Sequence, residues 1–291
     1  MRYVLITPAR NESVYIEQTV LAVIRQTIRP TKWIIVSDGS NDGTDDIVSK
    51  YAVKFPWIEL VRMSERKERH FGGKAMAFNA GRDHVRHIDY DVIGNLDADI
   101  IFDNEYFEFL LDKFANDDRL GVAGTPFREG NTQYDYRFSR REHVSGACQL
   151  FRRECFEMIG GYVPLKKGGI DLTAVVTARM KGWKTETFTD KACIHLRKMG
   201  KAGPNYLKYT FMGGYGDYIM GVHPAWQFFR SIYQMSAKPL FITGFLLLSG
   251  FLWGMMTHPS KPVTEEFVRF RRAEQVRWLN EYVKKALALL K

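Results

Sequence analysis

The sequence predicts an α/β fold for residues 1–125, with a mostly parallel central sheet and flanking helices. Short apolar runs alternate there with helical patterns of apolar residues, as they do in repeated strand–helix–strand units. The composition agrees with this, because 45% of the residues are hydrophobic and 26% are charged, which is typical of a folded chain with a sizeable core. A C-terminal region with helical patterns follows.

Each expected strand is a short apolar run that ends at a polar or turn-forming residue. The strands are expected at residues 3–7, 33–37, 58–61, 90–96 and 120–124. The first helix is expected to begin near Asn11 or Ser13, to carry Ile28 on its apolar face and to end at Pro30. Further helices are expected at residues 44–54, 74–85 and 104–114. Residues 127–200 are less regular, apart from a helix at 171–180 that Gly182 ends.

Two domains are expected, residues 1–205 and residues 206–291, and the charge is unevenly distributed along the chain. The net charge is +9, and from Lys191 onward there are 15 Lys and Arg against 5 Asp and Glu, so residues 1–190 are nearly balanced. A basic region of this kind can bind an anionic membrane surface or nucleic acid. Because it lacks a nucleic-acid motif and contains a long apolar segment, we expect a membrane surface and no nucleic acid.

That apolar segment is residues 239–257, which contain no charged residue. As a helix it would be about 28 Å long, close to the ~30 Å core of a bilayer. Both of its flanks are basic, which argues against a single crossing and for a segment that dips into the membrane and returns. Residues 264–291 are expected to form a basic amphipathic helix in the membrane interface. The alternative is a buried core helix followed by a surface helix.

The three cysteines, Cys148, Cys155 and Cys193, form no pair with metal-binding spacing. The opening residues show no secretory signal, so a reducing cytosol is expected, with buried and neutral thiols. Together with the basic region, this predicts a protein at the cytoplasmic face of the cell membrane, attached as a peripheral, re-entrant or single-segment protein.

Asp97-Ala98-Asp99 is the most informative motif, because two carboxylates follow directly after an apolar run that reads as a buried strand. Ligands of open α/β sheets bind at that edge. Adjacent carboxylates repel unless a cation or donor groups balance them, and a divalent cation that bridges to a diphosphate is the usual solution. A turn or a helix cap is the alternative explanation of the motif.

Several motifs in this order resemble the family 2 glycosyltransferases, which are nucleotide-sugar enzymes of the Rossmann-like GT-A fold. The resemblance runs from Tyr3 to about His195 and rests on residues 7–12, 36–44, 72–81, 97–99, 146–162 and 171–183. Three positions depart from the family pattern. Arg10 stands where Tyr is usual, Ser37 replaces a common Asp, and Ile170 replaces a Glu on the acceptor side.

The resemblance implies a role for each matching residue. Glu12 and Asp38 would contact the nucleotide base and ribose, with Pro8 and Ala9 lining the pocket. Lys74 would pair with the diphosphate, and Asp97 would hold the ribose or reach the metal through water. Asp99 would bind a divalent metal, Mg²⁺ or Mn²⁺, and His195 is the candidate further ligand. The alternatives are a turn cap for Asp38, a solvated charge for Lys74 and an ordinary core or surface histidine for His195.

Asp171 is the expected catalytic base, because the family commonly carries an Asp eleven residues before a Gly-Trp or Gly-Tyr pair, and Gly182-Trp183 stands there. The alternative is that Asp171 only caps its helix. The resemblance therefore implies an inverting transfer of one sugar from a nucleotide-sugar to a lipid-linked or cell-surface polysaccharide precursor, with a UDP-sugar favoured. Gln275-Val276-Arg277-Trp278 is one residue shorter than the motif of polymer-forming family members, which favours one sugar per acceptor.

Three other functions stay open at this stage. A polyprenyl-phosphate glycosyl synthase is the nearest alternative. A nucleotidyltransferase also places aspartate pairs on an α/β sheet, although it usually has a glycine-rich phosphate loop after the first strand, and residues 8–12 are not one. A non-catalytic binding protein on the same fold is the third.

Overall fold

The structure is a computed structural model that describes residues 1–64, 72–129, 132–133, 140–166, 168–197, 206–236 and 240–289. The chain consists of two compact units, Met1–Met199 and Gly200–Lys291. The domain boundary expected at residue 205 lies outside the described residues.

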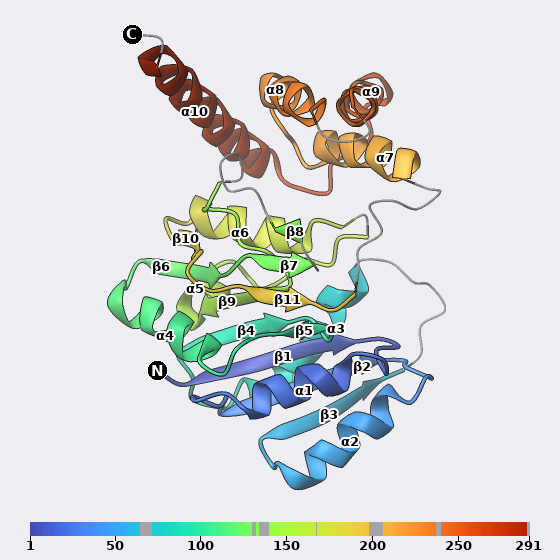
Figure 1. Cartoon of the computed structure of the whole chain (residues 1–291), viewed down its shortest axis with the longest axis vertical. Helices are drawn as coiled ribbons and strands as arrows, with labels where there is room; N and C mark the ends of the chain where they lie inside the picture. The colour runs from blue at the N-terminus through green and yellow to red at the C-terminus, as the bar shows by residue number, and fades with distance from the viewer. Residues whose placement is uncertain are drawn as a thin grey trace. The chain divides into compact units, whose positions relative to one another are not determined.

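A seven-stranded sheet forms the centre of the first unit (Figure 1). Its strands, in spatial order, are β10 (Lys184–Thr187), β6 (Leu120–Gly124), β9 (Cys148–Arg152), β4 (Val92–Leu96), β1 (Tyr3–Ala9), β2 (Lys32–Asp38) and β3 (Ile58–Met63). All neighbouring pairs are parallel except those of β9, which runs antiparallel to both β4 and β6. The mostly parallel sheet is therefore confirmed, whereas β9 falls in the stretch that the sequence left irregular.

A smaller sheet lies beside the central one and has the order β5-β11-β7-β8. Its strands are β5 (Ile100–Ile101), β11 (Cys193–His195), β7 (Phe127–Glu129) and β8 (Thr132–Gln133). Antiparallel pairing of β5 with β11 joins Ile101 to Ile194 and Ile100 to His195. This pairing carries the chain near residue 195 to the end of β4, where Asp97 and Asp99 lie.

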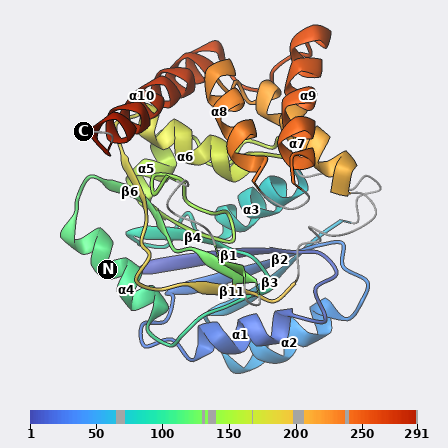
Figure 2. The ribbon, with the colours of Figure 1, turned by 45° about the horizontal axis from the view of Figure 1, so that its top comes forward.

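Helices cover both faces of the central sheet (Figure 2). The helices of the first unit are α1 (Ile16–Ile24), α2 (Thr44–Lys54), α3 (Gly72–Val85), α4 (Tyr106–Asn116), α5 (Arg153–Met158) and α6 (Ile170–Met180). Alternate strand residues point to opposite faces, so Leu5 and Trp33 join the core under α1 and α4, whereas Ile6 packs near Gly81 of α3. The alternation of strands and helices expected from the sequence is confirmed.

Helix α1 is shorter than expected. It ends at Ile24 instead of continuing to Pro30, and Ile28 is 37% exposed, so its expected place on the apolar face is wrong. The reason is a competing contact: the backbone N–H of Thr27 donates to the carbonyl of Asn104 at 2.8 Å, and the Gln26 amide donates to the carbonyl of Asp103 at 2.7 Å. These bonds direct the chain away from a further helical turn.

The second unit is helical in its described part. It contains α7 (Tyr206–Ile219), α8 (Pro224–Gln234), α9 (Ile242–Thr257) and α10 (Glu265–Leu289). The apolar segment predicted at 239–257 corresponds to α9, although Pro239 lies outside the described residues. None of the described helices combines the length and the apolar character that a membrane crossing needs.

Two residues of the near-motif at 275–278 have structural contacts in this unit. The Gln275 side chain accepts a hydrogen bond from the backbone N–H of His223 at 2.7 Å. Trp278 is 8% exposed and packs against Trp226 of α8, with ring centroids 5.6 Å apart. Both residues therefore join α10 to the start of α8.

Candidate active site

A cavity of about 810 Å³ opens at the carboxyl ends of the parallel strands in the first unit. All nine residues that the sequence singled out line it: Pro8, Ala9, Glu12, Asp38, Lys74, Asp97, Asp99, Asp171 and His195. They come from distant parts of the sequence, and wrong motif assignments would have left some of them outside the cavity. Their chemical roles stay predictions.

Three neighbouring parallel strands provide the floor of the cavity. Pro8 and Ala9 end β1, Asp38 ends β2, and Asp97 follows directly after β4. Because β4, β1 and β2 are adjacent and parallel, their carboxyl ends meet at the same edge of the sheet. Asp38 is buried, and its carboxylate lies 3.6 Å from the guanidinium of Arg10, the residue that replaces the usual Tyr.

Lys74 links the first turn of α3 to the carboxylates of the site. Its ammonium group pairs with the Asp97 carboxylate and donates to the carbonyl oxygen of Gly146 at 3.1 Å, although the side chain stays partly exposed. Burial lowers the pKa of Lys74, but the carboxylates of Asp97, Asp171 and Asp99 outweigh that effect and raise its pKa. Lys74 therefore keeps its positive charge next to the acidic residues.

For Asp97, burial has the largest effect and raises the pKa of its carboxyl group. The Asp99 carboxylate raises this pKa further, whereas the charge of Lys74 lowers it. Burial likewise raises the pKa of Glu12, with Asp99 and Asp97 acting in the same direction and Arg197 opposing them. Carboxyl groups gathered in this way resist ionisation, and a bound cation would stabilise their ionised forms.

Asp171 lies in the first turn of α6, whose N-cap is Gly169, with a φ angle of 84°. Asp171 is the acidic residue of this first turn, where a negative charge stabilises a helix, so a structural role in the helix stays the alternative to that of the base. Its side chain packs directly on Gly146: a Cβ atom built on Gly146 would lie 2.8 Å from the Asp171 Oδ2 atom and 2.9 Å from its Cβ atom. The absence of a side chain at position 146 thus makes room for the Asp171 carboxylate.

Asp99 and His195 are neighbours in the cavity, with 3.5 Å between the Asp99 Oδ2 atom and the His195 Nε2 atom. The His195 Nδ1 atom lies within hydrogen-bond distance of the Arg197 carbonyl, which can only accept, so we assign the proton to Nδ1. The lone pair of Nε2 then points towards the Asp99 carboxylate. This tautomer is the one that a metal-binding histidine adopts.

Asp99 and His195 would hold a divalent cation completed by water and diphosphate oxygens. The carboxylate and the oxygens are ligands that suit Mg²⁺ or Mn²⁺, whereas imidazole is more usual with softer divalent metals. Among the described residues, no group of three or more His, Cys, Asp or Glu side chains is arranged to hold a metal ion. A cation here would therefore depend on substrate oxygens for much of its coordination shell.

Arg197 is a residue of the cavity that sequence reasoning missed. Its guanidinium pairs with the Glu12 carboxylate, and its Nε atom lies 3.2 Å from the Asp99 Oδ2 atom. The backbone bond from Leu196 N–H to the Asp99 carbonyl, 2.9 Å long, brings it there. No local signal marks Arg197, because its position depends on the pairing of β5 with β11, which are far apart in the sequence.

The family model described as glycosyl transferase family 2 matches residues 4–170, which is more than half of the chain. The chain belongs to glycosyl transferase family 2. Among curated relatives, the poly-beta-1,6-N-acetyl-D-glucosamine synthase of Staphylococcus aureus strain COL is 33% identical over 117 residues. The enzyme of that name from Staphylococcus epidermidis is 29% identical over 121 residues. In both cases the match covers 40% of this chain and 26% of the relative, so the chain matches about a quarter of those proteins.

Two solved structures share the fold of this family 2 glycosyltransferase. The mannosyltransferase PcManGT from Pyrobaculum calidifontis, in complex with GDP-Man and Mn²⁺, superposes with a TM-score of 0.58 at 20% identity and covers 98% of this chain and 80% of its own. Residues 1–349 of S. aureus TarS, in complex with UDP-GlcNAc, give a TM-score of 0.56 at 14% identity, covering 93% and 78%. The fold is GT-A, and the family decides against the nucleotidyltransferase and the non-catalytic alternatives.

Proposed function

We propose that this glycosyltransferase moves one sugar, with inversion, from a nucleotide-sugar to a lipid-linked or cell-surface polysaccharide precursor at the cytoplasmic face of the membrane. The observation that carries the proposal is the single cavity in which the two aspartates after β4, Lys74 and the Asp171 carboxylate converge. A UDP-sugar is the favoured donor. The similarity to TarS, solved with UDP-GlcNAc, and to N-acetylglucosamine polymer synthases supports that choice.

Residues at the ends of β1 and β2 would bind the nucleotide. The buried Asp38 carboxylate can accept a hydrogen bond from the imide N–H of uracil, and Glu12 can accept one from a ribose hydroxyl. The Arg10 guanidinium, 3.6 Å from Asp38, can offer the base a planar face where the family usually has Tyr. Guanine also presents N–H donors, and the likeness to a GDP-Man complex keeps a GDP-sugar as the second donor candidate.

Asp171 would act as the general base. It would take the proton from the acceptor hydroxyl as that oxygen attacks the anomeric carbon in a single in-line displacement. Lys74 and Arg197 would place positive charge near the diphosphate that leaves. Asp99 and His195 would hold Mg²⁺ or Mn²⁺, and this cation, when bound, neutralises negative charge on the leaving group. Asp97 would hold the ribose or reach the metal through water, and its ion pair would hold Lys74 in place beside the donor.

The acceptor side of the proposal rests on the second unit. Acceptors that carry a lipid diphosphate are acidic at one end, which suits the basic residues after position 191. The curated relatives are named as polysaccharide synthases, which favours a glycan or its lipid-linked precursor as the acceptor. A polyprenyl-phosphate glycosyl synthase is the nearest variant of the same chemistry.

Transfer of radiolabelled sugar into a lipid extract tests this function. The purified chain is incubated with membranes and with UDP-GlcNAc or GDP-Man, with and without Mn²⁺. We expect label in the lipid or glycan fraction with one donor, loss of label without the metal, and at least a ~10³-fold lower rate in Asp171→Asn. A wild-type protein that binds donor but labels no acceptor, or an Asp171→Asn variant with full activity, would overturn the proposal.

A further inference from the structure

The α7–α9 helices of the second unit have glycines and polar side chains on the inside, beside a small apolar core that includes Ile219 and Phe251. A Cβ atom built on Gly214 of α7 would lie 1.9 Å from the Leu247 carbonyl oxygen of α9, and one on Gly250 of α9 would lie 1.9 Å from the Phe211 carbonyl oxygen of α7. The two backbones are therefore in direct contact through glycines on both helices. Packing of helices through small residues is typical of helices that associate in lipid.

The polar residues of these helices are buried between them. Gln227 and Ser231 of α8 are fully buried, and the Gln227 amide lies 3.5 Å from both the Ser231 hydroxyl and the Leu247 carbonyl. Thr243 of α9 is 7% exposed, and its hydroxyl lies 2.7 Å from that of Tyr206. Polar side chains that bond across helices, away from the outside, are a second feature of helices in an apolar solvent.

Large apolar side chains cover the outside of the same helices. They include Leu207 of α7, Phe228 and Ile232 of α8, and Phe245, Trp253 and Met256 of α9, which are 50–74% exposed. We call these six residues the apolar surface. A helix of a water-soluble protein turns its polar side outward, whereas the outward side of these helices is largely apolar. Single exposed apolar residues are ordinary, whereas several on three neighbouring helices are typical of an interaction surface.

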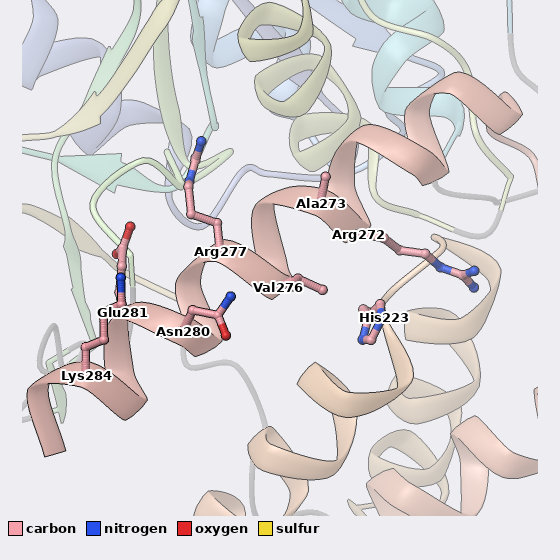
Figure 3. Close-up of a pocket in the computed structure, with 8 residues that line it drawn as sticks. All are labelled: His223, Arg272, Ala273, Val276, Arg277, Asn280, Glu281 and Lys284. Carbon is pink, nitrogen blue, oxygen red and sulfur yellow. The ribbon is translucent and has the colours of Figure 1, made fainter. Parts of the chain in front are cut away.

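Charge is almost absent from these helices. Lys208, Asp217 and Arg230 are the charged residues of α7–α9, and Arg230 pairs with Asp217, so their charges offset each other. The basic residues lie instead on α10. A cavity of about 740 Å³ is lined there by Arg272, Arg277 and Lys284, with Glu281 as its acidic residue and His223 facing it from the start of α8 (Figure 3).

His223 in this cavity can donate a hydrogen bond. Its Nδ1 atom accepts from the Ala225 backbone N–H at 3.2 Å, so the proton is assigned to Nε2. Burial and the neighbouring Arg272 lower the pKa of His223, so the ring is neutral at pH 7. A neutral donor beside arginine and lysine side chains suits a phosphate group.

We propose that the apolar surface of α7–α9 inserts into the headgroup and upper acyl region of an anionic phospholipid bilayer, while the basic cavity on α10 receives a lipid phosphate. The inference deepens the membrane association in the proposed function and rests on it. The exposed apolar side chains call for an apolar environment outside the helices, and the basic cavity selects an anionic surface over an apolar protein partner.

Sedimentation of the full chain with lipid vesicles tests the proposal. The vesicles contain phosphatidylcholine alone or with about a third phosphatidylglycerol. The test variant carries Phe245→Gln, Trp253→Gln and Met256→Gln, three exposed changes that leave the glycine contacts intact. The matched control carries Val53→Gln and Met158→Gln, which are 87% and 53% exposed in the first unit. A third variant carries Arg277→Gln and Lys284→Gln.

We expect wild type and control to bind anionic vesicles equally, the triple variant to bind at least about tenfold more weakly, and the third variant to lose the preference for anionic lipid. Brominated acyl chains should quench the fluorescence of wild type more than that of Trp253→Phe. Equal binding of triple variant and control, or no binding by wild type, would overturn the inference. UDP-GlcNAc binding is measured on the same preparations: its loss with vesicle binding intact would count against the proposed function alone.

Discussion

Replacing Gly146 by Ala should displace the Asp171 carboxylate while leaving the residue itself unchanged. Gly146 is buried and its φ angle is not positive, so an alanine backbone fits there. The added Cβ atom, however, would lie 2.8 Å from the Asp171 Oδ2 atom, 2.9 Å from its Cβ atom and 3.0 Å from its Cγ atom. The Gly146 carbonyl also accepts hydrogen bonds from Lys74 at 3.1 Å and from Asn95 at 2.8 Å.

The size of the effect follows from these distances. Ordinary contacts of a Cβ atom begin at 3.4 Å, so Asp171 or the backbone at 146 must move by about half an ångström. A displacement of 1 Å at a reacting group can cost about 100-fold in rate, so we expect kcat to fall by about 10- to 100-fold. Overpacking of this kind costs about 1–3 kcal/mol of stability, which is a decrease in Tm of several degrees and not unfolding at assay temperature.

The assay is sugar transfer at saturating donor, with thermal unfolding measured in parallel. Gly216→Ala is the control, because no atom lies within 4 Å of a Cβ atom at that helical position. It should keep its kcat and gain up to about 1 kcal/mol of helix stability. Turnover of Gly146→Ala within twofold of wild type would refute the idea that this glycine makes room for the base.

Three further predictions follow from the site and the core. Asp171→Asn should leave the donor Kd within about twofold by calorimetry while transfer is lost, and a parallel loss of binding would contradict its role as the base. Burial raises the pKa of Cys155 to about 12 and of Cys193 to about 11, so iodoacetamide at pH 8 should label neither thiol in the native protein, and mass spectrometry checks this. Burial raises the pKa of Glu12 above 4.5, so the folded state binds more protons at this residue than the unfolded state does. Ionising Glu12 therefore destabilises the wild type as the pH rises from 4.5, and the Tm of Glu12→Gln should increase relative to that of wild type over the same range. A Tm difference that does not change with pH would contradict this.

The strands that build the site could be predicted from local sequence. Each of β1, β2 and β4 is a mostly apolar run that is buried on both faces, and such runs are a clear strand signal in a single sequence. Because parallel strands end at one edge, the motifs after these runs had to converge there. The positions of Asp38, Asp97 and Asp99 in one cavity follow from that rule.

Contacts between distant segments could not be predicted in the same way. Strand β9 inserts antiparallel between β4 and β6, and its short sequence, Cys148–Arg152, carries no turn or period that reveals its partners. Arg197 reaches Glu12 and Asp99 only because β11 pairs with β5. The end of α1 was misplaced because the bond from Thr27 to Asn104 joins residues far apart in the sequence.

In the second unit the sequence indicated which residues are apolar but not which way they face. The apolar segment predicted the character of α9, whereas the burial of Gln227 and Ser231 depends on the approach of α8 to α9. A helical pattern with polar residues on one side reads as a surface helix when its partners are unknown. Which side chains of these helices face outward is therefore visible only once the helices are packed.

Calorimetric titration of the purified chain with UDP-GlcNAc, in Mn²⁺ and in EDTA, tests the central claim most directly, with GDP-Man titrated beside it. The account predicts that one donor binds in Mn²⁺, that EDTA weakens its binding at least about tenfold, and that Asp99→Asn does the same in the presence of the metal. Donor binding that is equally strong in EDTA, or the failure of both nucleotide-sugars to bind in Mn²⁺, would contradict it.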